Sequence, residues 1–347
     1  MKLLGPSTLP PPQRILVSQL RRIGDVLLCS PAVRALARHF QDAQIDFLVE
    51  SPAEEVVWCN PYIRKLIVPP TDSRLSTFLR VAHQIRRERY DWVIDFFSNP
   101  RSAQFASISG APVRVGLDRF GRRWAYSHRI VEEASDRELY AVDLRLQILA
   151  KMGVPDAGRE LEIYSDAADS EEAHRVDHVL EQLDRSRPVV ALATGSSNPA
   201  KLYPPELTVQ VMLGLLENGC ALVVTSGPGE SELAKAALHL LKKGVPYVPD
   251  ARVPTLAALY RHASIYVGPD SAPKHIAAAC EIPTVAFFGS GRPANWHDAL
   301  NPRDVLIEAP CDLRPNCTGS DCARRGCLQK IPPEKIVQAV LALLKNK

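Results

Sequence analysis

A carboxylate near the start of the chain could act as a general base. Asp25 follows Arg21, Arg22 and Gly24 directly after a short apolar run at residues 14–20. Glycine permits a tight turn, and the carboxyl end of the first strand of an open α/β sheet is a favoured place for ligands. An aspartate that begins a helix can instead serve as its N-cap, and the turn alone favours the cap.

A second candidate lies at residues 193–201, after another apolar run. Thr194, Gly195, Ser196 and Ser197 are followed by Lys201. Hydroxyls and backbone amides can donate to phosphate oxygens, and a lysine supplies a compact positive charge. The spacing is not that of a Walker loop, and an ordinary polar loop explains the segment equally well.

A third candidate lies at residues 268–279, where an apolar run meets a helix of small residues. Asp270 or Ser271 can cap this helix, which leaves the amides of Ser271 and Ala272 and the positive end of the helix dipole facing an anion. His275, one turn further, could reach the same ligand or be a partly buried structural histidine.

Glu230 ends a Gly-Pro-Gly-Glu segment at residues 227–230, after a further apolar run. The segment lacks the third glycine of a dinucleotide-binding turn, which argues against an oxidoreductase. A plain turn is the simpler interpretation, with Glu230 a weaker candidate for binding a sugar hydroxyl.

Four cysteines lie close together late in the chain: Cys311, Cys317, Cys322 and Cys327. Five, four and four residues separate them, which matches neither a zinc pair nor the common iron–sulfur runs. We expect no metal there and favour a loop with free or paired thiols.

These candidates must be positioned by alternating strands and helices. Short apolar runs and amphipathic helical stretches alternate in two series of about 150 residues, which predicts βαβ units and parallel sheets. A length of 347 residues also exceeds one ordinary core. We therefore expect an α/β protein with two doubly wound domains, at 1–165 and 166–332, and a last helix at 333–347. The predicted strands lie at residues 14–20, 44–49, 65–68, 91–96, 113–116, 188–193, 221–225, 265–268 and 284–288; the main predicted helices lie at 26–40, 75–90, 138–152, 206–217, 231–243 and 335–345.

Composition excludes several classes of protein. The hydrophobic fraction is 46% and the charged fraction 23%, as in globular proteins. No apolar run is long enough to span a membrane and residues 1–12 do not form a secretory signal, so we expect a cytoplasmic protein. A net charge of +3, without aromatic residues interleaved among the cations, argues against nucleic-acid binding. The charge is uneven: residues 1–160 hold 23 Lys and Arg against 18 Asp and Glu, and residues 161–347 hold 19 against 21.

Taken in order, the motifs resemble glycosyltransferase family 9, the ADP-heptose:lipopolysaccharide heptosyltransferases. The resemblance covers nearly the whole chain and is closest to the third-heptose or core-branch enzymes. It is carried by Arg-Ile-Gly-Asp-Val-Leu-Leu at 22–28, Tyr-Asp-Trp-Val-Ile-Asp at 90–95, Val-Gly-Pro-Asp-Ser-Ala-Pro-Lys-His at 267–275, Pro-Thr-Val-Ala-Phe-Phe-Gly at 283–289 and Ile-Pro-Pro-Glu at 331–334.

The resemblance implies a GT-B architecture, in which two facing Rossmann-like domains hold the acceptor and the nucleotide sugar and the last helix packs back on the first domain. It implies inverting transfer of heptose from ADP-heptose to the inner core of lipopolysaccharide, without a metal. No cofactor is implied, since the nucleotide sugar is a substrate. The implied partners are this donor, the lipopolysaccharide core and, peripherally, the cytoplasmic face of the inner membrane.

The resemblance also assigns roles to residues. Asp25 matches the general base, and Lys201 matches the cation that neutralises the departing diphosphate. The implied donor-binding residues are Thr194, Gly195, Ser196, Ser197, Glu230, Asp270, Ser271, Ala272 and His275. On the acceptor side we expect Arg21, Arg22, Gly24, Arg119, Arg122 and Arg123.

Departures from the family pattern bear on the donor. Thr194 stands in an Ala-Thr-Gly where many relatives have His-Pro-Gly, and Tyr203 replaces a tryptophan. Lys274 replaces an apolar or small residue and is expected to add charge near the donor. Two alternatives stay open: a GT-B enzyme that uses another nucleotide sugar, and a catalytically degenerate binding protein. The acceptor sugar, the linkage and the oligomeric state are not specified by the sequence.

Overall fold

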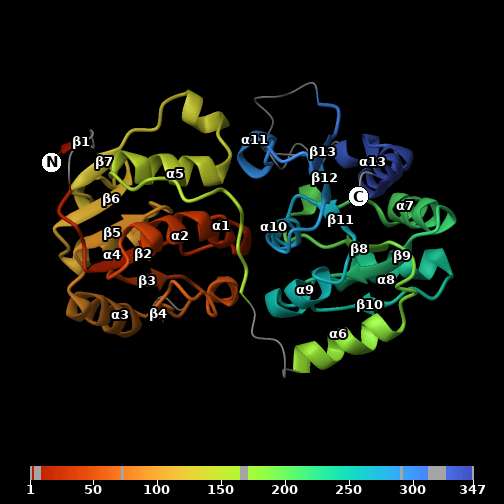
Figure 1. Ribbon diagram of the computed structural model, residues 1–347, viewed down its shortest axis with the longest axis horizontal. Coiled ribbons are helices and arrows are strands. Elements are labelled where there is room, and N and C mark those ends of the chain that lie inside the picture. Colours follow the sequence, from red (N-terminus) through yellow and green to blue (C-terminus); the bar gives the residue numbers. More distant parts are fainter. Residues whose placement is uncertain are drawn as a thin grey trace. The chain divides into compact units, whose positions relative to one another are not determined.

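The computed structural model describes residues 2–3, 9–71, 74–164, 171–289, 292–311 and 326–345. The chain divides into two compact units, residues 1–164 and 165–347 (Figure 1). The division falls at the start of the polar stretch 165–187. Each unit is an α/β structure with its own parallel sheet.

The first unit is built on a seven-stranded sheet of order β1-β7-β6-β5-β2-β3-β4. Its central strands are continuous apolar runs that are buried on both faces, as expected when helices cover a parallel sheet. Helices α2 and α5 contact each other, as do α3 and α4, and the two pairs lie on opposite faces of the sheet (Figure 1). The strands are β1 Lys2–Leu3, β2 Arg14–Ser18, β3 Gln44–Leu48, β4 Lys65–Ile67, β5 Trp92–Asp95, β6 Val113–Leu117 and β7 His128–Ile130; the helices are α1 Ile23–Leu27, α2 Ser30–His39, α3 Leu75–Glu88, α4 Pro100–Ser109 and α5 Ala141–Lys151, with 3-10 turns η1 Ala53–Val56, η2 Arg123–Ala125 and η3 Ser135–Glu138.

The second unit has a six-stranded sheet of order β10-β9-β8-β11-β12-β13, again parallel throughout. Its strands are β8 Val189–Ala193, β9 Ala221–Thr225, β10 Tyr247–Val248, β11 Ile265–Pro269, β12 Thr284–Phe288 and β13 Asp304–Glu308. Its helices are α6 Glu171–Glu181, α7 Pro205–Glu217, α8 Ser231–Leu241, α9 Val253–Tyr260, α10 Ala272–Ala279, α11 Pro293–Trp296 and α13 Pro333–Lys345, with 3-10 turns η4 Pro199–Lys201 and η5 Cys327–Lys330.

One detail differs from the sequence-based expectation. The helix predicted at residues 26–40 is two helices, because Pro31 lies in the first turn of α2 and lacks the amide hydrogen that a continuous helix needs. Within its own unit, the last helix, α13, contacts α7, β11 and β12, and its residues Ile336, Val337 and Val340 belong to the core of the second unit. Its expected packing on the first domain stays a prediction.

The parallel sheets determine where functional residues can meet. All carboxyl ends of a parallel sheet lie at the same edge, and neighbouring strands are about 4.8 Å apart. In the second unit β8 lies between β9 and β11. The turns that carry Glu230, residues 194–201 and Asp270 are therefore adjacent.

A charged cluster joins α3 to the edge of the first sheet. Glu88 on α3 binds Lys65 at 2.6 Å and Arg64 at 2.9 Å. Arg64 also forms two hydrogen bonds with Asp46, whose side chain is fully buried on β3. Hydrogen bonds from Lys65 and Arg64 lower the pKa of Glu88 from 4.5 to about 2.

Glu88 therefore stabilises the fold in its ionised form. Its folded pKa is lowered, so the contribution is complete above the unfolded pKa and is lost as the pH falls through the interval from about 4.5 to 2. We expect Glu88→Gln to reduce stability in urea unfolding at pH 6 and to differ much less from the parent protein at pH 3. Glu232→Gln is the matched control, because that side chain is 92% exposed. An equal effect of Glu88→Gln at both pH values would contradict this account.

Candidate functional site

Lys201 and Asp270 form an ion pair at the carboxyl edge of the second sheet. Lys201 Nζ lies 2.7 Å from Asp270 Oδ2 and donates to the Asp270 carbonyl oxygen at 2.6 Å. The lysine is positioned by η4, where the Asn198 side chain accepts a hydrogen bond from the Ala200 amide at 3.0 Å. The Asp270 side chain is 4% exposed and that of Lys201 24%. The structure thus brings together two residues that are 69 positions apart and were predicted for one site.

Glu230 lies against the turn that follows β8. A Cβ atom built on Gly195 would collide with the Glu230 carboxylate, so only glycine fits beneath this side chain. Burial raises the pKa of the Glu230 carboxyl above its ordinary value. Glu230 is therefore part of the same cluster as Gly195, which the simpler interpretation of a plain turn did not anticipate.

The hydroxyl residues after β8 differ in availability. Thr194 is 7% exposed and donates to the Thr225 carbonyl oxygen at 3.5 Å. The Ser196 hydroxyl accepts a hydrogen bond from the Asn198 amide at 3.2 Å, whereas Ser197 is exposed. Two of these three hydroxyls already organise the turn, and Ser197 is the one presented to solvent.

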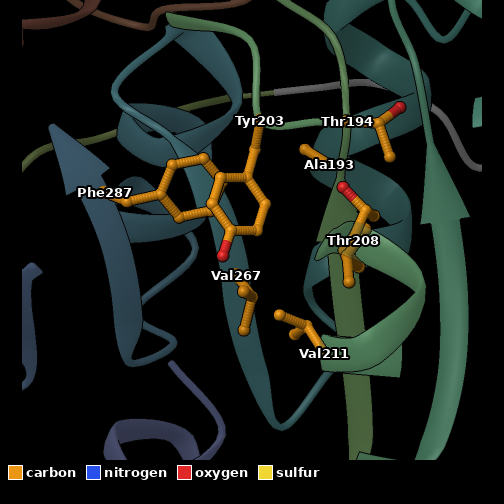
Figure 2. A pocket seen from close by; sticks show the side chains of 8 residues that line it. Ala193, Thr194, Tyr203, Thr208, Val211, Val267 and Phe287 are labelled. Atoms are coloured by element: carbon orange, nitrogen blue, oxygen red, sulfur yellow. The ribbon is translucent and has the colours of Figure 1, made fainter. Parts of the chain in front are cut away.

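Thr194 and Ala193 also line one side of a small apolar cavity of about 10 Å³, shown in Figure 2. The Tyr203 and Phe287 rings line it, with centroids 5.1 Å apart, and Val211 and Val267 close it from below. This volume is close to that of a single water molecule, so the cavity cannot hold a nucleotide. It lies behind the turn and belongs to the core that supports it.

Ser271 is the N-cap of α10, as one of the two sequence alternatives proposed, and Ala272 is its first residue. His275 is 4% exposed and makes an edge-on contact with Trp296, with ring centroids 6.4 Å apart. This burial matches the structural alternative for His275, although the residue lies within one turn of the helix start.

Lys274 does not add a charge beside the donor site, contrary to expectation. Its side chain is 1% exposed, and Nζ donates to Asp304 Oδ2 and to the Trp296 carbonyl oxygen, both at 2.7 Å. Burial alone would raise the pKa of the Asp304 carboxyl, but hydrogen bonds and the charge of Lys274 hold it well below its usual range. Lys274 therefore anchors α10 to β13 inside the second unit.

In the first unit, Asp25 is not the N-cap of its helix. The helix begins at Ile23, and Asp25 Oδ2 accepts a 3.4 Å hydrogen bond from the backbone amide of Arg22. The Asp25 side chain is 22% exposed, so a substrate hydroxyl can reach it. Asp25 thus binds the amide of the N-cap residue, Arg22, and is also partly exposed.

Arg145 on α5 contacts Asp25 and was not among the predicted site residues. It donates to the Asp25 carbonyl oxygen at 3.2 Å and to Cys29 Sγ at 3.1 Å, and lies 3.8 Å from Asp25 Oδ1. Its side chain is 9% exposed. A signal was present in the sequence: Arg145 shares the apolar face of its helix with Val142 and Leu149, where a solvent-facing arginine would not be placed.

The predicted acceptor-side arginines fall into two groups. Arg21 binds Glu50 at 2.9 Å, and Arg101 binds the other oxygen of this buried carboxylate at 2.6 Å. Glu50 and Arg101 are thus two further residues at the edge near Gly24 and Arg22 that the site prediction missed. Arg119, Arg122 and Arg123 follow β6, which is two strands away from β2 in the sheet. Arg119 binds Glu132 at 3.4 Å and Arg123 binds Asp118 at 2.6 Å.

The predicted cysteine loop is described only at its ends. Cys317 and Cys322 lie outside the described residues, whereas Cys311 and Cys327 are free thiols. Cys327 is buried in the core of the second unit.

Two Rossmann-like units, each with charged turns at the carboxyl ends of its strands, agree with the GT-B architecture expected from the sequence. The family model described as "Glycosyltransferase family 9 (heptosyltransferase)" matches residues 78–322. The chain belongs to this family. That match begins after Asp25, so it does not test the assignment of Asp25 as base, which comes from the resemblance.

Individual relatives agree with the family. Lipopolysaccharide heptosyltransferase 3 of Escherichia coli is 24% identical over 299 residues, covering 81% of this chain and 85% of that protein. The crystal structure of the glycosyl transferase family 9 from Veillonella parvula has a TM-score of 0.84 at 21% identity and covers 98% of this chain and 100% of that one. E. coli ADP-heptose lps heptosyltransferase II has a TM-score of 0.77 at 19% identity, with coverages of 96% and 99%. The first of these agrees with the resemblance to third-heptose enzymes.

The position of Lys274 predicts a structural role. Lys274→Met leaves the Asp304 carboxylate buried without its counter-ion, so we expect a loss of about 3–5 kcal/mol in the free energy of unfolding. Lys335→Met on the exposed face of α13 is the control and should change stability by less than about 0.5 kcal/mol. Urea unfolding measures both. If Lys274→Met has normal stability but does not bind ADP, the structural role is wrong and Lys274 belongs to the donor site.

Proposed function

We propose that this enzyme transfers heptose from ADP-heptose to a sugar of the lipopolysaccharide core, with inversion at the anomeric carbon and without a metal. The observation that carries the chemistry is the partly exposed Asp25 carboxylate, held between the Arg22 amide and Arg145. The donor and acceptor classes are supported by the relatives, one of which is titled an ADP-heptose lps heptosyltransferase.

In this proposal Asp25 acts on the acceptor. The acceptor hydroxyl oxygen attacks the anomeric carbon of the donor and passes its proton to the Asp25 carboxylate. Arg145 keeps that carboxylate in place by binding both the Asp25 carbonyl oxygen and, more distantly, its Oδ1 atom. Attack from the face opposite the leaving group inverts the configuration.

Lys201 acts on the leaving group. As the bond between the anomeric carbon and the diphosphate oxygen breaks, the electron pair remains on the diphosphate, and its growing charge is stabilised by the ammonium of Lys201. This lysine supplies the charge that a metal ion supplies in other transferases. Asp270 orients Lys201, and Glu230 over Gly195 offers a carboxylate to a donor hydroxyl. Ser197, Ser271 and Ala272 line the same edge.

The acceptor side of the proposal rests on charge. Lipopolysaccharide cores carry phosphate and carboxylate groups, and arginine is suited to both. Arg21, with its side chain 61% exposed, and the nearby Arg22 are available beside Asp25. Because such acceptors are lipid-linked, the proposal includes peripheral contact with the membrane that carries them.

Asp25→Asn keeps the shape and the bond from the Arg22 amide but removes the proton acceptor. We expect kcat to fall by about 10²–10⁴-fold while ADP binding is unchanged. Product analysis with ADP-heptose and a truncated core acceptor measures turnover. Isothermal titration calorimetry measures the affinity for ADP. Asp143→Asn, in an ion pair with Arg159 on the same unit, is the control and should retain activity. Near-normal turnover of Asp25→Asn would remove Asp25 as the base.

Lys201→Met removes the cation from the donor edge. We expect weaker ADP binding and a fall of about 10²–10³-fold in kcat, because the charge of the leaving group grows in the transition state. Lys235→Met on α8 is the matched control, since its side chain is 62% exposed. Thermal shifts with ADP and UDP measure binding. Stabilisation by UDP but not ADP would exclude ADP-heptose as donor, and unchanged kinetics would exclude Lys201 from the site.

A further inference from the structure

A loop after β6 presents large aromatic side chains to solvent. In this aromatic loop, Asp118–Trp124, the Phe120 side chain is 93% exposed and that of Trp124 56%. Val131, 48% exposed, lies beside the loop, since the Asp118 amide donates to the carbonyl oxygen of neighbouring Ile130 at 2.7 Å. Grouped exposure of apolar side chains, unlike a single exposed leucine, marks a surface that binds something.

The loop is held by its own hydrogen bonds. The Arg122 amide donates to the Arg119 carbonyl oxygen at 3.1 Å, and Asp118 binds both Arg123 at 2.6 Å and Arg129 at 3.1 Å. The aromatic side chains are thus displayed by an ordered turn, and binding does not have to pay for ordering the loop.

The Trp124 indole can be transferred out of water without losing a hydrogen bond. Its Nε1–H donates to the Gly121 carbonyl oxygen at 3.0 Å, within the same loop. An indole whose donor is satisfied internally can enter an apolar medium without leaving that donor unpaired. Phe120 has no polar atom in its side chain, so neither ring opposes transfer out of water.

The charge around these rings selects the partner. Residues 118–133 contain four arginines against Asp118, Glu132 and Glu133, a balance of +1. The Arg119 side chain is 47% exposed and pairs with Glu132, and that of Arg123 is 54% exposed and pairs with Asp118. The excess of positive charge at this surface attracts an anionic partner. Aromatic side chains together with arginines are typical of the membrane interface.

We propose that the aromatic loop docks the enzyme on an anionic lipid bilayer. Phe120 and Trp124 enter the interfacial region, and the arginines of the loop contact lipid phosphates, each adding salt-sensitive attraction. The contact is peripheral: no helix among the described residues has the length and apolarity to cross a bilayer. The inference rests on the proposed function in one respect: a lipid-linked acceptor requires the enzyme to work at a membrane.

The test is co-sedimentation with vesicles that contain neither acceptor nor nucleotide sugar. We expect the parent protein to bind vesicles of phosphatidylcholine and phosphatidylglycerol, to bind phosphatidylcholine alone much less, and to be released by salt. The double variant Phe120→Ser/Trp124→Ser should bind at least about tenfold more weakly. Leu240→Ser on α8, where the side chain is 46% exposed, is the matched control and should bind as the parent does.

A second measurement separates this inference from its rivals. Transfer to a soluble core acceptor without acyl chains should be unchanged in Phe120→Ser/Trp124→Ser, whereas transfer to acceptor embedded in vesicles should fall. Absence of parent binding to anionic vesicles, or full binding by the double variant, overturns the proposal. Loss of transfer to the soluble acceptor would instead assign the loop to acceptor recognition. Vesicle binding without any heptosyl transfer would leave the docking surface intact and refute the proposed function.

Discussion

Parallel strand pairing is the constraint on which the rest of the molecule depends. It brings every strand's carboxyl end to one edge, so that residues far apart in sequence become neighbours through strand order alone. In the second unit, β9, β8 and β11 place Glu230, Lys201 and Asp270 on adjacent turns that span about 10 Å. The strands supply apolar side chains to the core, and the turns supply the charged side chains at the edge.

Charge pairing is the second level of organisation. Two charged residues near the start of α10 pair in different places: Lys274 pairs with Asp304 inside the second unit, while Asp270, just before the helix, pairs with Lys201 at the edge of the sheet. In the first unit, Arg145 links Asp25 to α5, so the position of the proposed base depends on a helix more than a hundred residues later in the chain. The two lysines differ in burial, since the Lys274 side chain is 1% exposed and that of Lys201 24%, whereas their carboxylate partners are equally buried.

The sequence predicted the sheets well because buried strands are continuous apolar runs; all nine of its runs contain strands. It missed β1, β7, β10 and β13, which are short or carry polar residues: β1 has two residues, His128 and Arg129 occupy β7, and Asp304 begins β13. The turns were found because their glycines, hydroxyls and charges follow apolar runs. The partners of Lys274 and Asp25 were not found: the apolar face of its helix marks Arg145 as buried, but long-range side-chain pairing leaves no local pattern that names the partner.

The pairing of Lys201 with Asp270 has a consequence for selectivity. A lysine that already has a carboxylate partner presents little net charge to its surroundings, so a small anion such as inorganic phosphate gains little by approaching it. A diphosphate offers several oxygens along one chain and can compete with a single carboxylate oxygen for the ammonium. In the proposed function, the Asp270 carboxylate is therefore an internal competitor for the Lys201 ammonium, and the donor diphosphate has to compete with it.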